Sequence, residues 1–304
     1  MNENSRTIAI TGASGMVGSN LSSSLSKQGH QVIPLRRGKS QPKGSDVFWD
    51  PDGLGICDPQ RLAGVDTIVH LAGENIAAGR WTTAQKQRIR SSRVDATRNL
   101  VRSLKQMEQP PTTFVCASAI GIYGDRGDEQ LTERSDPGSG FLVDVCRDWE
   151  GAAAEAETAG MRVVQVRIGV VLSAQGGALA KMLTPFKLGM GGIVGSGKQY
   201  WSWIGLGDVV GVLEEAVTNE SLRGPINAVS PNSMTNREFT KVLGKVLRRP
   251  TSFPLPGFMA KLILGEMAKE LLLSSARVVP DALMKSGFQF QHADLETCLR
   301  HELP

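Results

Sequence analysis

Short runs of β-branched and other apolar residues alternate along the chain with segments whose apolar residues recur every three or four positions. The short runs predict buried strands, at Thr7–Ile10, Gln31–Leu35, Asp66–Leu71, Phe114–Ala117, Arg162–Ile168 and Gly224–Val229. The longer segments predict amphipathic helices, over 16–28, from near Thr82, over 142–159, over 208–218 and from Thr235. Two helix starts have the spacing of a capping box, in which threonine precedes Gln or Glu by three residues: Thr82–Gln85 and Thr235–Glu238.

This alternation indicates the fold class. Strands that alternate with helices form a parallel sheet covered on both faces, because each crossover helix packs back onto the sheet. We therefore predict an α/β protein with a Rossmann-type doubly wound parallel sheet and a smaller, mainly helical C-terminal lobe. The pattern changes after about residue 173, so we place the Rossmann domain at residues 1–172 plus 206–229 and a substrate-side lobe at 173–205 plus 230–304.

The segment 253–273 is strongly apolar, with Phe258, Leu262 and Ile263 among its residues. Lys261 and Glu266 interrupt it, so it does not reach the run of about 18 apolar residues that a membrane-spanning helix needs. We expect this segment to form the core of the C-terminal lobe. A dimer face is the alternative.

Composition and charge exclude several classes of protein. Of 304 residues, 40% are hydrophobic and 21% charged, which excludes a disordered chain. The formal net charge of +4 is too small to indicate a nucleic-acid-binding surface. We expect neither nucleic acid nor membrane as a partner. The four cysteines and four histidines show no metal-ligand spacing, so we expect no metal site and reduced thiols. Six mostly polar residues precede the first strand, and we expect a cytoplasmic protein without a targeting segment.

Three glycines at a spacing of three residues follow the first predicted strand and open the first predicted helix. Gly12 permits the tight turn, Gly15 lets a pyrophosphate approach the backbone, and Gly18 lets the helix pack against the strand. The free amides and positive dipole end of the helix N-terminus then hold the phosphates. This arrangement predicts a dinucleotide site.

The end of the second predicted strand indicates which dinucleotide binds. An NAD site usually carries Asp or Glu about 20 residues after the glycine motif, where the carboxylate bonds the ribose hydroxyls. Here the strand ends in Arg36 and Arg37, and no acid stands between residue 30 and Asp46. A carboxylate would repel the 2′-phosphate of NADP, whereas guanidinium pairs with it. We therefore expect NADP(H); a pair of solvated surface arginines is the simpler alternative.

A second glycine-rich stretch, Gly192–Lys198, nearly matches the P-loop pattern of nucleotide triphosphate-binding proteins. The residue after Lys198 is Gln199 where that pattern needs Ser or Thr, and no strand-to-helix context surrounds it. We interpret this stretch as a loop that borders the substrate site, with Trp201 and Trp203 packed below it.

Taken together, these motifs resemble the extended short-chain dehydrogenase/reductase superfamily. More specifically, the chain resembles an atypical, epimerase-like subgroup with its own C-terminal domain, in the segments Thr11–Gly18, His70–Ile76, Gly79–Trp81, Cys146–Glu150, Arg167–Leu172, Trp201–Ile204, Leu264–Met267 and Ser286–Phe288. The resemblance implies a Rossmann fold with an NADP site and an unassigned substrate. It also implies cofactor contacts at Gly12, Ser14, Gly15, Met16, Val17, Gly18, Leu71, Ala72, Gly73, Arg167 and Ile168.

The catalytic pair that this superfamily usually carries is missing. Its chemistry needs Tyr-x-x-x-Lys on one helix face, where Lys lowers the Tyr pKa for proton transfer. The protein has two tyrosines; Tyr123 is followed four residues later by Gly127, and Tyr200 by Ile204. Where the motif should fall, three pairs are candidates and none contains tyrosine: Phe141/Val145, Leu142/Cys146 and Val143/Arg147.

Two explanations of this absence stay open. The first is an enzyme with another acid/base arrangement. In it Ser118 polarises a carbonyl and Tyr123 approaches the nicotinamide, with Glu74 or Asp144 as further candidates. Strand-end hydrogen bonding for Ser118, packing for Tyr123 and loop hydrogen bonding for Glu74 are the structural alternatives. The second explanation is a non-catalytic NADP-binding regulator, whose cofactor occupancy a partner senses.

Overall fold

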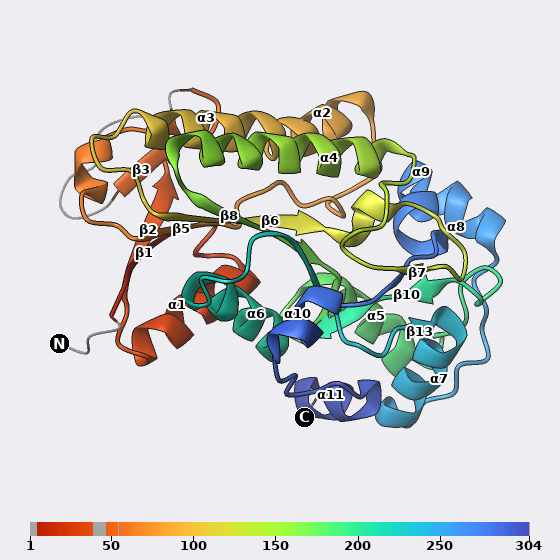
Figure 1. Cartoon of the computed structure of the whole chain (residues 1–304). Coiled ribbons are helices and arrows are strands. Elements are labelled where there is room, and N and C mark those ends of the chain that lie inside the picture. The colour runs from red at the N-terminus through yellow and green to blue at the C-terminus, as the bar shows by residue number, and fades with distance from the viewer. Residues whose placement is uncertain (1–4, 39–46, 54, 304) are drawn as a thin grey trace.

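The computed structural model describes residues 5–38, 47–53 and 55–303, and an eight-stranded sheet lies at its centre (Figure 1). The strand order is β12–β8–β6–β5–β1–β2–β3–β4, and neighbours are parallel except β3 and β4. The chain enters at β1, winds out to β2 and then back through β5, as predicted for a doubly wound sheet. The strands are β1 (Thr7–Thr11), β2 (Gln31–Arg37), β3 (Val47–Asp50), β4 (Gly55–Ile56), β5 (Thr67–His70), β6 (Thr113–Ala119), β8 (Arg162–Ile168) and β12 (Gly224–Ala228).

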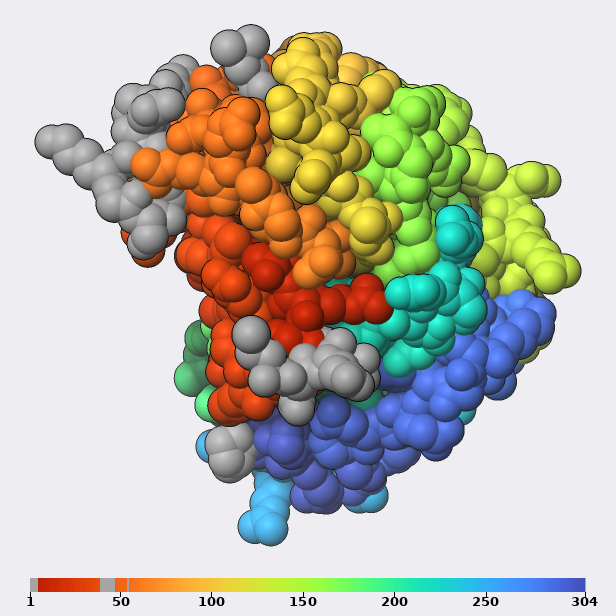
Figure 2. Space-filling model, turned by 60° about the vertical axis from the view of Figure 1, so that its left-hand side comes forward, coloured from red at the N-terminus to blue at the C-terminus, as the bar shows by residue number. Residues whose placement is uncertain are grey.

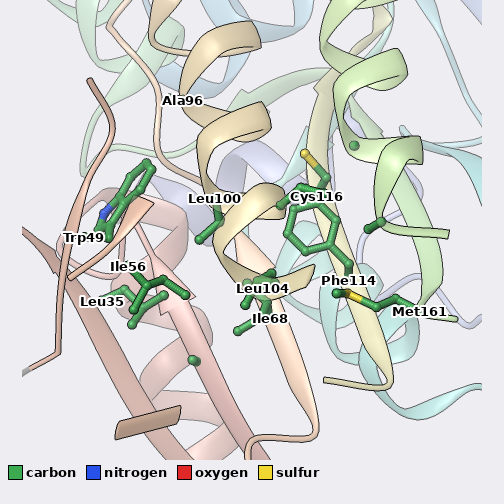
Figure 3. Packing of buried hydrophobic residues seen from close by; sticks show 14 of the residues in the cluster. Leu35, Trp49, Ile56, Ile68, Ala96, Leu100, Leu104, Phe114, Cys116 and Met161 are labelled. Carbon is green, nitrogen blue, oxygen red and sulfur yellow. The ribbon is translucent and has the colours of Figure 1, made fainter. Parts of the chain in front are cut away.

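One face of the sheet is covered by α3 (Val94–Lys105) and α4 (Phe141–Ala154). Figure 3 shows Leu100 and Leu104 of α3 directed onto Ile68 and Phe114 of the sheet. All four side chains are fully buried. Burial of each contributes about 1.5–3 kcal/mol, so this layer supplies much of the free energy of folding.

The opposite face is covered by α1 (Met16–Lys27) and α6 (Leu206–Thr218). Leu21 and Leu25, the residues whose spacing predicted the first helix, are fully buried there. Leu283 of α10 (Asp281–Ser286) joins the same cluster, so the end of the chain is part of the Rossmann core. Figure 2 shows the C-terminal residues in blue forming a continuous surface with the segment in teal. The predicted division into two domains stays a prediction.

The helix predicted from Thr82 is interrupted. Residues Thr83–Ser91 form α2, and α3 starts at Val94. The break has a physical reason at Ser92 and Arg93. The hydroxyl of Ser92 accepts a hydrogen bond from the backbone N–H of Glu74, and the guanidinium of Arg93 donates to the carbonyl oxygens of Ile89 and Glu74. The break therefore fixes the loop that follows β5.

Both predicted capping sites cap a helix, to different extents. Thr235 and Glu238 form a complete capping box at the start of α7 (Asn236–Leu247), whereas the Thr82 side chain accepts a hydrogen bond from the Gln85 N–H. The segment predicted as a helix over 142–159 continues past α4 as a tighter 3₁₀ turn, Glu155–Ala159.

A smaller cluster surrounds Leu179, Trp203 and Phe239. It is built from β9 (Val170–Leu172), α5 (Gly177–Lys187), β10 (Tyr200–Trp201), β11 (Trp203–Gly205), β13 (Met234–Thr235), α7 (Asn236–Leu247), α11 (Leu295–Glu302) and Leu272 of a π-helical turn (Lys269–Leu273). The C-terminal part of the chain also forms α8 (Gly257–Leu264), α9 (Glu266–Ala268) and β14 (Arg277–Val278). Three short elements complete the described chain: two 3₁₀ turns, Pro59–Leu62 and Ile120–Tyr123, and β7 (Gln130–Leu131).

The expectation that segment 253–273 forms a core is wrong for α8. Phe258 and Leu262 are 73% and 74% exposed, and Ile263 is 56% exposed. Only the side of α8 that carries Ala260 is buried. Apolar content predicts burial of a helix only when another element covers each of its faces, and nothing in the described part of the chain covers this one.

The Gly192–Lys198 stretch is not a P-loop. It lies between α5 and β10, and Val194 forms a bridge with Leu255 rather than opening a helix. Trp201 and Trp203 are buried, as expected. All four cysteines are free thiols. Within the described residues, no helix is both long enough and apolar enough to cross a membrane.

Candidate functional site

The predicted dinucleotide turn connects β1 to α1 at the carboxyl edge of the sheet. Gly12 has φ of +71°, and a Cβ there would lie 2.9 Å from the backbone nitrogen of Ala72. A Cβ on Gly18 would lie 2.2 Å from the carbonyl oxygen of Gly12. Both positions therefore need glycine, one for the turn and one for the close approach of α1 to β1.

The start of α1 is open to a ligand. Ser14 and Gly15 are exposed, Met16 and Val17 are half-buried, and Gly15 caps the helix without a side-chain hydrogen bond. A Cβ at Gly15 would meet only the Gly12 carbonyl within 4 Å, at 3.3 Å. Amides at a helix N-terminus with the positive end of the helix dipole bind phosphate, so this turn fits a pyrophosphate.

Arg36 and Arg37 lie beside this turn, as predicted. In the parallel pairing of β1 with β2, Leu35 is opposite Thr11, which brings Arg36 level with Gly12. Both arginine side chains are exposed. Asp46, the next acid in the sequence, lies outside the described residues. The end of β2 therefore carries two exposed arginines next to the phosphate turn.

The segment Leu71–Gly73 is held against the turn by a contact that sequence reasoning missed. The Thr11 hydroxyl oxygen accepts hydrogen bonds from the N–H groups of Leu71 and Ala72, and it lies 2.7 Å from His70 Nδ1. Since the hydroxyl already accepts from two amides, its hydrogen points to Nδ1. Burial lowers the pKa of His70 to about 3, so the ring is a neutral acceptor. This contact could have been anticipated from the sequence, because two polar residues, Thr11 and His70, stand at the ends of two buried strands.

Ser118 lies at the end of β6, but its hydroxyl is turned toward α4. It donates a hydrogen bond to Glu150 Oε1 at 2.6 Å, and the residue is 4% exposed. The same carboxylate accepts hydrogen bonds from Nε and one terminal nitrogen of Arg167, both at 2.8 Å. Ser118 is thus part of a buried ion-pair network, which disfavours its predicted role of polarising a carbonyl.

Tyr123 lies in the same network and does not reach a surface. Its phenol accepts from Arg167 at 2.9 Å and donates to Asn227 Oδ1 at 2.7 Å, and the side chain is fully buried. Burial raises the pKa of Tyr123, so the phenol stays protonated. The expected approach of Tyr123 to a nicotinamide does not fit this placement; the structural alternative does.

Arg167 was expected to contact the cofactor, but its guanidinium is paired with the Glu150 carboxylate instead. Burial by itself would lower its pKa, but the hydrogen bonds and charge of Glu150 raise it, so the guanidinium stays charged. A buried charge needs such a partner. Ile168, the next residue, is half-buried at the carboxyl end of β8 and stays available for the predicted contact.

Of the three candidate positions for the missing catalytic pair, one faces the turn after β6. A Cβ on Gly121, in the turn after β6, would lie 3.5 Å from Leu142 Cβ and 3.8 Å from Cys146 Sγ. Leu142 and Cys146 therefore occupy the helix face directed at the end of β6. Burial raises the pKa of Cys146 to about 12, so its thiol stays protonated. Leu142 and Cys146 therefore offer no acid or base, and the carboxylate of Glu150, one turn further along α4, is held by Ser118 and Arg167.

Two further candidates occupy different environments. Asp144 is exposed on α4 and bonds to Arg147. Glu74 is half-buried after β5, with Gln85 Nε2 at 3.5 Å from its carboxylate. Its neighbour Asn75 bonds within its own loop, to Ala77 N–H.

A segment from the end of the chain packs over the start of α4. The carboxylate of Glu270, in the π-helical turn, lies next to Gly140, which caps α4: a Cβ on Gly140 would lie 2.9 Å from its Oε1. Nearby, Glu266 forms an ion pair of 2.8 Å with Lys86 of α2, and the Lys86 ammonium lies 4.5 Å from the centre of the Phe141 ring. The C-terminal segment therefore contacts both helices next to the candidate site.

Comparison with known proteins identifies the family. The chain matches the model of the NAD dependent epimerase/dehydratase family over residues 8–228, and a domain of unknown function (DUF1731) over residues 255–302. An epimerase family protein of Mycobacterium bovis is 41% identical over 285 residues, which cover 94% of this chain and 93% of that one.

Solved structures agree with this match. The human epimerase family protein SDR39U1, crystallised with NADPH, is 30% identical with a TM-score of 0.85, over 97% of this chain and 98% of that one. A nucleoside-diphosphate sugar epimerase of Corynebacterium glutamicum is 40% identical with a TM-score of 0.81; it covers 98% of this chain, which spans 58% of that longer chain. The predicted resemblance is confirmed, and the chain belongs to the NAD dependent epimerase/dehydratase family.

Proposed function

We propose that this chain binds NADP(H) and uses it in oxidoreductase or epimerase/dehydratase chemistry on a small molecule of unassigned identity. The observation that carries the cofactor choice is the pair Arg36 and Arg37, exposed at the end of β2 beside the phosphate turn. Two cations favour the 2′-phosphate of NADP, which an acidic residue at this place would repel. The human relative solved with NADPH supports the same choice.

The residues along the carboxyl edge of the sheet fit such a cofactor. The glycine turn and the start of α1 would hold the pyrophosphate, and Leu71–Gly73 would line the site beside it. Ser14, Met16 and Val17 would contribute from the first turn of α1. When bound, the nicotinamide would supply or accept hydride. A cytoplasmic location, and the absence of nucleic acid and membrane partners, remain predictions.

A second function is favoured by one specific observation. Ser118 and Tyr123, the two residues predicted to act in catalysis, are both buried in a network with Glu150 and Arg167. Such a site supports a non-catalytic NADP-binding regulator, in which binding of the nucleotide shifts the population of a conformation that a partner recognises.

The cofactor proposal is tested by identifying any nucleotide that copurifies with the protein and by measuring Kd for NADPH and NADH. We expect NADPH to bind at least tenfold more tightly, and Arg36→Ala with Arg37→Ala to remove that preference while NADH binding changes little. Arg300→Ala, on α11, is the control for a lost surface charge. Equal affinities in the unmodified protein, or an unchanged preference in the double variant, would refute the NADP assignment.

A panel of carbonyl and sugar-nucleotide substrates, followed through NADPH absorbance, separates the two functions. Turnover of any substrate supports the enzyme. Tight NADPH binding without turnover, together with a nucleotide-dependent change in hydrogen exchange, supports the regulator.

A further inference from the structure

The helix face that would carry the superfamily's proton-transfer pair holds Leu142 and Cys146, so this site needs its acid from elsewhere. The side chain that the structure brings to the same turn is Glu270. Its carboxylate lies against the backbone at the start of α4, where a Cβ on Gly140 would lie 2.9 Å from its Oε1 and 3.1 Å from its Oε2. A carboxyl group from the C-terminal segment therefore lies at the first turn of α4.

The backbone around Glu270 is unusual. Residues Lys269–Leu273 form a π-helical turn, a conformation that is rare in proteins and frequent at functional sites. The glutamate is half-buried rather than solvated. A simple surface helix would need neither feature.

The electrostatic environment suits proton transfer. Burial raises the pKa of Glu270, and the neighbouring carboxylate of Glu266 raises it further. The Leu142 N–H and the ammonium groups of Lys269 and Lys86 oppose this rise, and the net shift is upward. An acid whose pKa is raised toward neutrality is suited to both giving and taking a proton.

We infer that Glu270 is the acid/base of this site, in place of the tyrosine and lysine of the superfamily; the inference rests on the proposed NADP(H) function. In the reducing direction, Glu270 donates its proton to a substrate carbonyl oxygen while hydride from NADPH reaches the carbonyl carbon. A C–H and an O–H bond form, the C=O double bond becomes single, and the carboxylate is left. In the oxidising direction the carboxylate takes the hydroxyl proton and NADP⁺ takes the hydride.

This assignment gives the segment that matches the DUF1731 model a defined role. The Rossmann domain supplies the cofactor turn, and the C-terminal segment supplies the proton. The competing interpretation is that Glu270 only caps α4. Glu270→Gln separates the two, because the amide keeps an acceptor oxygen at the start of α4 but has no carboxyl proton to give.

The test uses the charge difference between NADP⁺ and NADPH and needs no substrate. A carboxylate near the nicotinamide is stabilised by the positive ring of NADP⁺, so its pKa falls in that complex. By linkage, the ratio of NADP⁺ to NADPH affinity should rise about tenfold as pH rises from 5 to 8. The ratio is measured by titration calorimetry at several pH values. Asp148→Asn, which removes another carboxylate from α4, one that is paired with Arg90, is the matched control.

We expect the wild-type and Asp148→Asn proteins to show this rise, and Glu270→Gln to give a flat ratio with an unchanged Tm. A flat ratio in the wild type, or a rise that persists in Glu270→Gln, overturns the inference while leaving the cofactor proposal intact. Failure to bind either nucleotide overturns both. If Glu270→Gln does not fold, ¹³C-glutamate NMR of the wild type decides: a glutamate whose pKa differs between the two complexes supports the inference, and its absence refutes it.

Discussion

The Glu150 carboxylate of α4 holds the Arg167 guanidinium of β8 through two hydrogen bonds of 2.8 Å each. The pair is nearly buried and also binds the hydroxyls of Ser118 and Tyr123. It thus connects a helix, two neighbouring strands and the turn after β6. Three polar residues that were predicted to act in catalysis or cofactor binding, Ser118, Tyr123 and Arg167, therefore hold the framework of the site in place.

Breaking this pair should destabilise the fold. Glu150→Gln leaves the Arg167 charge buried without a counter-ion, and we expect a loss of about 3–5 kcal/mol in the free energy of unfolding. The measurement is urea unfolding followed by circular dichroism. The double variant Glu150→Leu with Arg167→Met should lose less than the single one. A double variant that is worse than Glu150→Gln would show that the hydrogen bonds to Ser118 and Tyr123 matter more than the charges.

Gly18→Ala should weaken both folding and nucleotide binding. The added methyl would lie 2.2 Å from the Gly12 carbonyl, so α1 must move. We expect a loss of about 1–3 kcal/mol in stability and at least tenfold in NADPH affinity. Gly151→Ala, in α4 with open space around it, is the control and should stabilise by about 0.5–1 kcal/mol. Unchanged NADPH binding in Gly18→Ala would contradict the proposed phosphate site.

His70 should make the protein less stable in acid. The folded chain keeps this ring neutral to about pH 3, whereas the unfolded chain takes up a proton near pH 6.5. The unfolded state therefore binds more protons between these values, and stability falls by up to about 1.4 kcal/mol per pH unit as pH drops below about 6.5. Unfolding at pH 7.5 and pH 5 measures this slope. His70→Asn, which keeps an acceptor for Thr11, should flatten it, and an equal slope in the variant would refute the assignment.

The apolar side chains of α8 should matter little to stability. Phe258 and Leu262 are mostly exposed, so replacing each by Gln should change the free energy of unfolding by less than about 0.5 kcal/mol. Phe239, which is 2% exposed, is the contrast: Phe239→Ala should cost about 3–5 kcal/mol. Thermal and urea unfolding measure both. Comparable losses at Phe258 and Phe239 would mean that α8 is covered in solution.

Local patterns predicted six of the eight strands of the sheet and the cofactor turn, since their causes are local; β3 and β4 were not predicted. The apolar runs of β1, β5, β6 and β8 are buried on both faces, and Leu21 and Leu25 mark the buried side of α1. The break between α2 and α3 was missed, because its cause is a contact of Ser92 and Arg93 with a loop distant in sequence.

The amino-acid sequence by itself determined the Rossmann-type sheet, the glycine turn, the arginines at the end of β2 and the absence of the Tyr–Lys pair. Periodicity, backbone conformation at glycine and residue identity depend on a few neighbouring residues. They can therefore be recognised in a single sequence. Only the tertiary structure decided that Ser118 and Arg167 are buried partners of Glu150, that Tyr123 is buried against Arg167, that α8 is exposed and that Glu270 reaches the start of α4. These facts depend on which distant segments pack together, and burial, hydrogen-bond partners and pKa values follow from that packing.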